Sequence, residues 1–130
     1  MRAVTRFSSG APWEPVVGYS RAVVAGGFVF VTGCTSIDGG EVVHDGDHYA
    51  QTRQALANVT TALAQAGATP RDVVRTRSFV TDISRWEEYG RAHGEVVGDV
   101  LPATSMVEVS ALIDPRMLVE VEAQAWIGEK

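Results

Sequence analysis

The sequence predicts an α+β fold in which two helices pack on one face of a mixed six-stranded sheet. Six short runs are rich in β-branched and aromatic residues, and turns containing glycine or proline separate most of them. Two longer segments instead repeat apolar residues at helical spacing. The order is three strands, helix, strand, helix and two strands, and the connections are short enough for one sheet and one layer of helices.

Three strands are expected near the N-terminus, at residues 3–7, 19–25 and 28–32. Residues 8–15 contain one glycine and two prolines, so a loop without regular structure is expected there. The second and third strands are joined by Gly26-Gly27, a dipeptide that adopts the positive φ angles of a tight hairpin turn. Residues 33–47 are rich in turn-forming residues, and Val42-Val43 is compatible with a strand fragment.

The clearest helix is predicted at residues 47–66. Asp47 is a candidate N-cap, and Gly67 is a candidate C-terminal stop. Polar residues, including Gln51, are expected on the solvent side of this helix. The apolar stripe expected to face the sheet consists of Thr52, Ala55, Leu56, Val59, Ala62, Leu63 and Ala66.

A β-rich run at residues 73–80 precedes the second helix, which is expected at about residues 85–97 with Ser84 as its cap. Strict alternation in this run would put Val74 on the same face as Thr76, Ser78 and Val80. The helix is amphipathic, so one side should pack against the sheet. The residues on that side are Trp86, Tyr89, Ala92 with His93, Val96 and Val97.

Residues 101–126 contain the last two strands. In the final run, one face carries Val119, Val121, Ala123 and Ala125, and the other carries Leu118, Glu120, Glu122, Gln124 and Trp126. The first face is predicted to join the core. Because both helices cover one face of the sheet, the second, mixed face is predicted to be hidden in a closed symmetric oligomer. The alternative is an amphipathic face exposed to solvent.

Composition excludes several classes of protein. The 130 residues, 45% hydrophobic and 21% charged, fit one ordinary domain over residues 1–130. A formal charge of -5 with scattered basic residues counts against nucleic-acid binding. Cys34 is the only cysteine, which excludes an intrachain disulfide and a cysteine-rich metal site. The longest apolar run, residues 22–31, is too short to span a bilayer, so no membrane partner is expected and a cytoplasmic location is the default.

Six segments, in this order and spacing, resemble the RidA/YjgF family of reactive intermediate deaminases over essentially the whole chain. They are GYSRA at 18–22, FVFVTG at 28–33, QTRQALANV at 51–59, DVVRT to VTD at 72–82, PATSMVEV at 102–109 and VEVEA at 119–123. The resemblance implies a chorismate-mutase-like α+β fold, a homotrimer, and small-molecule clefts between neighbouring subunits. It also implies that no cofactor or metal is required.

The resemblance further implies hydrolysis of reactive enamines and imines, such as 2-aminoacrylate, to a keto acid and ammonia. By this resemblance Glu120 would help to place the attacking water, while Tyr19 and backbone groups near Gly33 would line the cleft. Deaminating members bind the substrate carboxylate with an arginine in a Pro-Ala-Arg-Ser motif, since a guanidinium pairs with a planar acid through two hydrogen bonds.

The sequence departs from the family at this motif. Thr104 occupies the arginine position, Ser105 follows it, and Met106 stands where the family often has cysteine. A threonine hydroxyl offers one neutral hydrogen bond in place of two charge-assisted ones, so efficient hydrolysis of 2-aminoacrylate is not expected. The chain therefore resembles the arginine-lacking subgroups. The candidate site consists of Glu120 as the catalytic group and, for substrate binding, Tyr19, Arg21, Gly33, Cys34, Thr104, Ser105 and Met106.

Arg21 lies two residues from Tyr19, so both side chains are expected on one face of their strand. This placement leads to the hypothesis that Arg21 has taken over part of the anion-binding role. The alternative is an ion pair with Glu120 or Glu122 across the sheet, in which case Arg21 supports the strand and binds nothing.

Other interpretations remain open at the sequence level. Glu120 and Glu122 could be solvated strand acids, although only Glu120 matches a family site position. Packing or surface roles are the alternatives for Tyr19, Cys34 and His93. The function could be imine hydrolysis, small-molecule binding by a trimer that lost the chemistry, or the ribonuclease activity attributed to some relatives, which the acidic composition disfavours.

Overall fold

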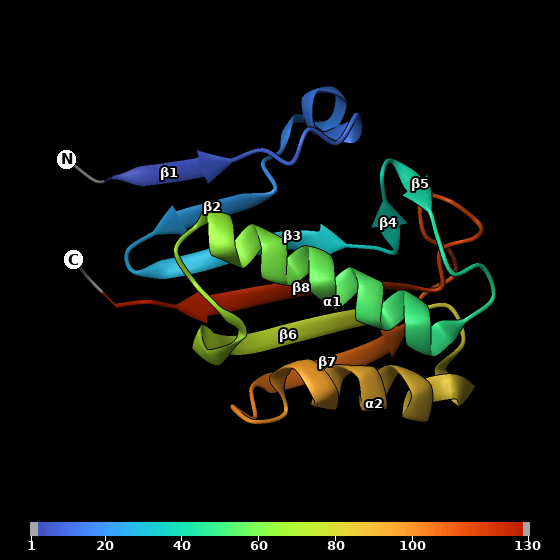
Figure 1. Ribbon diagram of the computed structural model, residues 1–130. Helices are drawn as coiled ribbons and strands as arrows, with labels where there is room; N and C mark the ends of the chain where they lie inside the picture. Colours follow the sequence, from blue (N-terminus) through green and yellow to red (C-terminus); the bar gives the residue numbers. More distant parts are fainter. Residues whose placement is uncertain (1–2, 129–130) are drawn as a thin grey trace.

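The computed structural model describes residues 3–128, and its centre is a six-stranded sheet (Figure 1). Its strands are β1 (Val4–Phe7), β2 (Ala22–Ala25), β3 (Phe28–Cys34), β6 (Val73–Val80), β7 (Ala103–Glu108) and β8 (Val119–Trp126). They lie in the order β1-β2-β3-β8-β6-β7. The β6 and β7 strands are parallel, and every other neighbouring pair is antiparallel. The predicted mixed six-stranded sheet is therefore confirmed.

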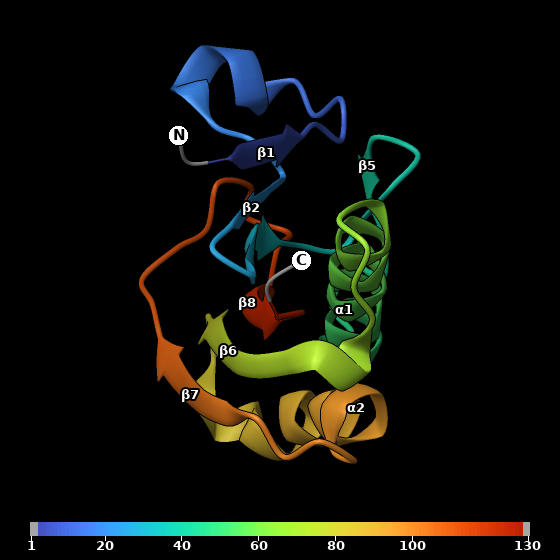
Figure 2. The same cartoon turned by 90° about the vertical axis from the view of Figure 1, so that its left-hand side faces the viewer.

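Two helices, α1 (His48–Gln65) and α2 (Trp86–Val97), cover the same face of the sheet, as the side view in Figure 2 makes plain. The short elements are the π-helical turn η1 (Glu14–Gly18), the 3-10 turns η2 (Pro70–Asp72) and η3 (Ile83–Arg85), and a hairpin of β4 (Ile37–Asp38) and β5 (Glu41–Val42). Among residues 3–128, no helix is long and apolar enough to cross a membrane.

The first helix begins and ends where the sequence predicts. The Asp47 side chain accepts a hydrogen bond from the Ala50 amide, which satisfies one of the free N–H groups of the first turn. Gly67 follows the helix with a φ of 83°, a conformation that glycine adopts without strain. The predicted stripe packs on the sheet, and of its members only Ala66 is not fully buried.

Gln51 is the exception on this helix, because it was expected on the solvent side and is fully buried. Its Nε2 donates to the carbonyls of Arg116 and His44, at 2.8 and 3.2 Å, and its Oε1 accepts from the Leu118 amide at 2.9 Å. Burial of an amide side chain is tolerated when its groups are hydrogen-bonded. Gln51 thereby ties α1 to the loop that leads into β8.

The N-terminal region differs from the prediction in two places. Residues 14–18 form the π-helical turn instead of continuing an irregular loop. The Tyr19 amide bonds back to the carbonyl of Glu14, so pairing in β2 begins at Ala22 and not at residue 19. The hairpin turn itself is confirmed, with positive φ at Gly26 and Gly27.

Two further local predictions are wrong. A β-bulge in β6 shifts the alternation, so Val73 is buried in the core while Val74 is exposed on the opposite face. Ser84 does not cap the second helix: Asp82 caps the preceding η3 turn by accepting from the Ser84 amide. Since α2 starts beyond this turn, Trp86 lies at its exposed N-terminal end.

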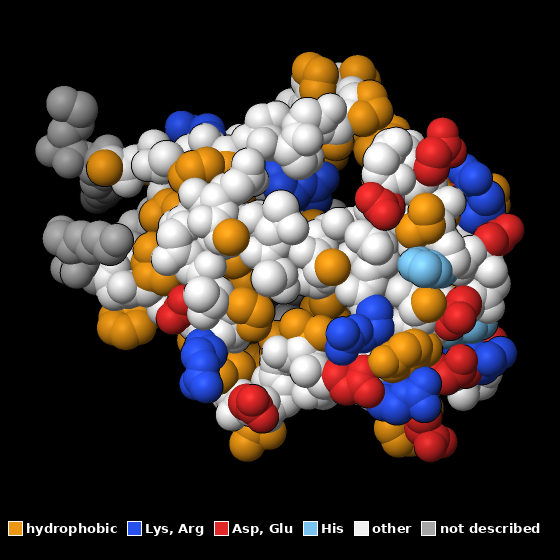
Figure 3. Space-filling view, in the orientation of Figure 1, with side chains coloured by type: hydrophobic (Ala, Val, Ile, Leu, Met, Phe, Trp, Pro, Cys, Tyr) orange, Lys and Arg blue, Asp and Glu red, His pale blue; other side chains and the backbone are white. Residues whose placement is uncertain are grey.

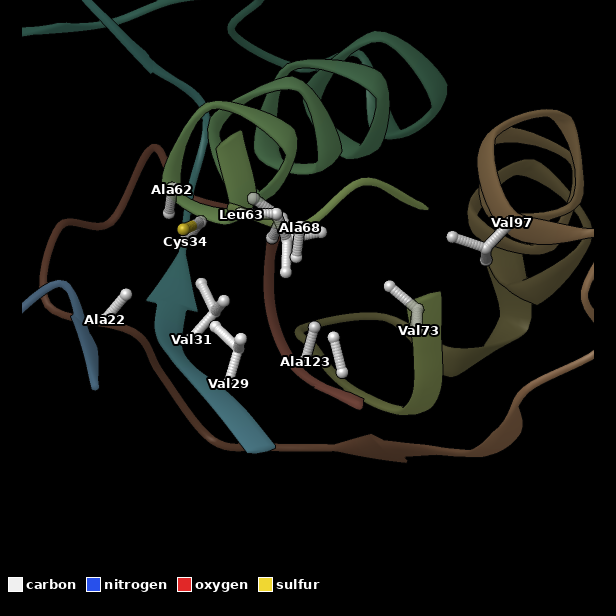
Figure 4. Packing of buried hydrophobic residues seen from close by; sticks show 12 residues of the cluster. Ala22, Val29, Val31, Cys34, Ala62, Leu63, Ala68, Val73, Val97 and Ala123 are labelled. Atoms are coloured by element: carbon white, nitrogen blue, oxygen red, sulfur yellow. The ribbon is translucent and has the colours of Figure 1, made fainter. Parts of the chain in front are cut away.

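The hydrophobic core lies between the sheet and the two helices. Figure 4 shows Val29 and Val31 of β3 pointing toward Leu63 of α1, with Ala123 of β8 beside them. A second cluster packs Tyr89 of α2 against β6 and β8. As predicted, Val119, Val121, Ala123 and Ala125 of β8 all face the core.

No helix of the described part of the chain covers the opposite face of the sheet, which carries both apolar and charged side chains. Phe28, Phe30 and Trp126 are each at least 40% exposed on this face, and the two phenylalanine rings lie 6.2 Å apart. Arg77 and Glu122 form an ion pair at 3.1 Å across β6 and β8. This pairing supports a structural role for Glu122.

Candidate functional site

A cavity of about 720 Å³ opens where β3 ends. The segment from Ser9 to Arg21, the end of β3, the C-terminal half of α1 and Glu120 of β8 form its walls. Figure 3 shows this face of the molecule hollowed beside the N-terminal segment, with a basic side chain in the hollow. Five of the predicted site residues line this cavity: Tyr19, Arg21, Gly33, Cys34 and Glu120.

Arg21 is held in the cavity wall by several contacts. Its Nη1 donates to the carbonyls of Gly33 and Thr32, at 2.9 and 3.3 Å, and contacts the Cys34 Sγ at 3.5 Å. Its guanidinium carbon lies 5.7 Å from the centre of the Tyr19 ring, a distance typical of a cation–π contact. Although β2 starts after both residues, Arg21 and Tyr19 share one side of the chain as predicted.

Glu120 presents a partly buried carboxyl group to the same cavity. Burial raises the pKa of Glu120, the charge of Glu122 raises it further, and the charge of Arg21 opposes both effects. Among residues 3–128, Glu120 forms no ion pair within 4 Å. A carboxyl group with a raised pKa in a cavity is a candidate for proton transfer to and from a ligand.

Gly33 makes room for this carboxyl group. A Cβ atom at position 33 would overlap the Glu120 carboxylate, so only glycine permits the observed approach of β3 and the Glu120 side chain. The Gly33 carbonyl is already engaged by Arg21. Gly33 therefore positions both charged groups of the cavity, one by its carbonyl and the other by its missing side chain.

Cys34 is 4% exposed, and in Figure 4 its sulfur points toward Ala62 of α1. Burial raises the pKa of the Cys34 thiol, while the neighbouring Arg21 guanidinium opposes the rise. A thiol that keeps its proton is a poor nucleophile. The structure thus favours the packing role for Cys34 that the sequence left open.

The remaining predicted residues lie on β7, beyond β6, and do not line this cavity. Thr104 faces the helices, where its Oγ1 lies 2.7 Å from the Thr76 Oγ1, which in turn lies 2.7 Å from the His93 Nε2. Met106 packs against the core, and Ser105 lies on the opposite face. One chain therefore does not bring Thr104, Ser105 and Met106 together with Glu120.

Two features of the cavity were not foreseen. Glu14 is buried and accepts hydrogen bonds from Ser8 and from the Ser9 and Ala11 amides, which fixes the N-terminal wall. Burial opposes ionisation of Glu14, but the bonds from Ser9 and Ser8 lower its pKa overall. Asn58 of α1 donates to two carbonyls of the segment after β3, at 2.9 and 2.8 Å. No local pattern marks these residues, because their partners depend on the turn and on helix docking.

No group of three His, Cys, Asp or Glu side chains with the geometry to hold a metal ion is present in residues 3–128.

The family model described as Endoribonuclease L-PSP matches residues 9–127 of this chain. The chain belongs to the RidA/YjgF family. The curated relatives of this family include the uncharacterized protein SCO2049 of Streptomyces coelicolor, 40% identical over 97% of this chain and 94% of its own length. They also include the RutC family protein PH0854 of Pyrococcus horikoshii, 37% identical over 92% of this chain and 94% of its own length.

Solved members of the family share the fold. Rv2704 of Mycobacterium tuberculosis, described as a member of the YjgF/YER057c/UK114 family, is 53% identical, with a TM-score of 0.88 over 96% of this chain and 100% of the other. YyfA of Yersinia pestis, a Rid family protein of unknown function, is 32% identical, with a TM-score of 0.85 over 96% and 100% of the two chains. The chorismate-mutase-like α+β fold is therefore established for this chain.

Proposed function

We propose that this RidA/YjgF protein hydrolyses a reactive imine or enamine to a carbonyl compound and ammonia, with Glu120 as the general acid and base. The observation that carries the proposal is the Glu120 carboxyl group, which is partly buried, free of an ion pair among residues 3–128, and directed into a cavity of about 720 Å³. Tyr19 and Arg21 would form the wall against which the substrate lies.

The chemistry needs one group that both takes and gives a proton. An enamine first becomes the iminium ion by taking a proton on its β-carbon, and an imine by taking one on nitrogen. Water attacks the carbon of the C=N bond, and ionised Glu120 accepts the proton that the water loses as the new C–O bond forms. The protonated Glu120 then returns this proton to the carbinolamine nitrogen and becomes a carboxylate again. The C–N bond breaks, ammonia leaves with the bonding electrons, and the Glu120 carboxylate accepts the hydroxyl proton as the C=O bond forms. A pKa raised above the ordinary value of a glutamate favours both proton-accepting steps, because it makes the Glu120 carboxylate a stronger base.

The substrate is not expected to be 2-aminoacrylate. Thr104 stands at the family's arginine position, and its neutral hydroxyl offers no charge to a substrate carboxylate. This hydroxyl is also already within 2.7 Å of the Thr76 hydroxyl. We therefore propose that the imine substrate of this protein is not bound through an arginine at position 104, in contrast to the substrate of arginine-bearing relatives.

We further propose a homotrimer in which β7 of one subunit approaches the cavity of its neighbour. This arrangement would add Thr104, Ser105 and Met106 to the site, which one chain alone leaves incomplete. The exposed Phe28, Phe30 and Trp126 on the uncovered sheet face support an oligomer. Light scattering at micromolar concentration should give three times the chain mass, and a monomer mass would refute the assembly.

The direct test is ammonia release from a panel of imines generated in situ from different amino acids. Release above the uncatalysed rate with at least one imine supports hydrolysis. A protein that binds small molecules in the cavity but accelerates no imine would instead be a binding or regulatory trimer. Degradation of RNA, the activity in the family model's description, would displace the proposal, although the net charge of -5 disfavours an RNA substrate.

A further inference from the structure

We propose that Arg21 is the anion-binding group of the cavity and that it binds a small organic carboxylate. The proposal deepens the function above and rests on it for one point only, namely that the bound carboxylate belongs to the substrate. The binding site itself stands on the position, the charge and the contacts of Arg21.

The first observation is that Arg21 forms no ion pair with an acidic side chain within residues 3–128. The ion pairs within residues 3–128 join Arg53 with Glu95, Arg77 with Glu122, Arg85 with Glu88, and Arg116 with Asp114. Arg21 is absent from this set although Glu120 lies in the same cavity. A guanidinium remains charged at every physiological pH, so the cavity wall carries a positive charge that is not neutralised by direct contact.

The second observation is that the guanidinium is held in place and still has unused donors. Nη1 is engaged by backbone carbonyls, Nε lies 3.4 Å from the Ser9 Oγ, and the Tyr19 ring contacts the group as described above. No hydrogen bond joins Nη2 to any of residues 3–128. A donor that is already oriented loses little conformational entropy when a ligand binds.

The third observation concerns the rest of the wall. The cavity is also lined by Trp13, Val17 and Ile113, and Val17 and Ile113 are 70% and 62% exposed. Its volume of about 720 Å³ lies in the range of small-molecule sites, roughly 300–1,000 Å³. A fixed cation beside apolar side chains fits an organic carboxylate with a hydrocarbon or aromatic part better than it fits an inorganic anion.

A purely structural role for Arg21 makes a different prediction. Its bonds to the carbonyls of Thr32 and Gly33 link the segment before β2 to β3, and they would stabilise the fold without any ligand. In that case Arg21 variants would change thermal stability but not the preference between a charged ligand and its neutral analogue.

The experiment compares benzoate with benzamide, which share a shape and differ in charge. Binding is measured by titration calorimetry and by chemical shifts of the cavity amides in the intact 130-residue chain. We expect wild type to prefer benzoate by roughly 10- to 100-fold, the loss typical for one charge-assisted contact. Arg21→Gln should abolish the preference, and Arg21→Lys should restore part of it, because an ammonium cannot copy the planar group.

Arg77→Gln is the matched control, because Arg77 is an arginine of the same sheet that is paired with Glu122 and does not line this cavity. It should leave the preference for benzoate unchanged. Equal binding of benzoate and benzamide by wild type, or absence of benzoate binding, overturns the proposal even if Arg21→Gln fails to fold. A preference that survives in folded Arg21→Gln overturns it as well.

These outcomes are separable from the proposed reaction. Arg21-dependent binding of benzoate without ammonia release from any imine would retain the anion site and reject the hydrolysis. Ammonia release with no preference for benzoate would retain the hydrolysis and reject the anion site.

Discussion

Two regions of the sheet, the C-terminal end of β3 in its middle and the β7 strand at its edge, differ in how their polar groups are paired. At the end of β3, Arg21 and Glu120 share a cavity without forming an ion pair. At the β7 edge, Thr104, Thr76 and His93 form a neutral chain in which both contacts are 2.7 Å long. The first region leaves two charged side chains without a direct ion pair, whereas the polar side chains of the second region contact one another.

The difference indicates where the protein has given up folding stability to keep polar groups unpaired for a ligand. A hydroxyl has one proton and two acceptor sites, and the fully buried Thr76 hydroxyl is already shared between two partners. Charged groups held out of water without a direct partner cost free energy unless a ligand compensates. The unpaired charges at the end of β3 are consistent with the proposed ligand site there, whereas the described hydrogen-bonding groups at the β7 edge are engaged with one another.

Among the substitutions considered for the two regions, replacement of the Glu120 carboxyl group should change imine turnover most. Glu120→Gln should lower imine turnover by about 10²–10⁴-fold, since an amide cannot relay a proton. It should also raise the free energy of unfolding at neutral pH. Burial raises the folded-state pKa of Glu120, so ionisation above pH 4.5 destabilises the folded protein, and the amide removes this cost.

Glu122→Gln is the control for this variant, because Glu122 sits on the same face of β8 and pairs with Arg77. It should keep most of the turnover because the carboxyl group of Glu120 is intact, although the pKa of Glu120 should fall when the charge of Glu122 is removed. It should lose only about 0.2–1 kcal/mol of stability, as for exposed ion pairs. Unchanged turnover in Glu120→Gln, measured by ammonia release, would remove Glu120 from the mechanism.

Gly33→Ala should cause the second-largest loss of imine turnover. The added methyl group would displace the Glu120 carboxylate, and a misplacement of about 1 Å can cost roughly 10²-fold in rate. The carboxylate is the mobile end of a side chain, so folding should survive, as a thermal melt would verify. Gly90→Ala on α2, where a Cβ would lie 3.9 Å from Trp86, should leave turnover intact and add about 0.5–1 kcal/mol of stability. Equal turnover in the two variants would contradict this account.

A positive charge introduced at the β7 edge should change turnover by less, and it should increase turnover where the two substitutions above decrease it. Thr104→Arg should raise hydrolysis of 2-aminoacrylate by about tenfold, because it restores a charge-assisted contact to the carboxylate. Ser105→Arg, on the other face of the same strand, should give no increase. If the wild-type protein already hydrolyses 2-aminoacrylate as fast as an arginine-bearing relative does, the importance of position 104 is refuted.

The smallest effect concerns acid stability at the β7 edge. Burial lowers the pKa of His93, so the unfolded chain binds this proton more readily than the folded one. Stability from His93 is therefore complete above pH 6.5 and is lost as the pH falls from 6.5 toward the lower folded-state pKa. His93→Gln should flatten this part of the stability curve in denaturant titrations. An identical slope in the variant would show that His93 does not contribute.

The sequence by itself determined the elements that depend on local signals. Asp47 and Gly67 bound α1 because capping and left-handed backbone need particular residues at one position. The Gly26-Gly27 hairpin and the buried face of β8 follow from equally local rules. Segments spread over the whole chain also identified the family from the sequence. The same alignment of motifs showed that Thr104 replaces the family's arginine.

Only the tertiary structure decided which polar residues are free and which are engaged. Gln51 is polar by sequence yet buried, because its partners are carbonyls and an amide from residues 44, 116 and 118. Arg21 could have paired with either glutamate of β8; Arg77 takes Glu122, and the β3 carbonyls hold Arg21 beside Glu120 without a direct pair. Such choices depend on distances between segments far apart in the chain, which no periodicity within one segment encodes.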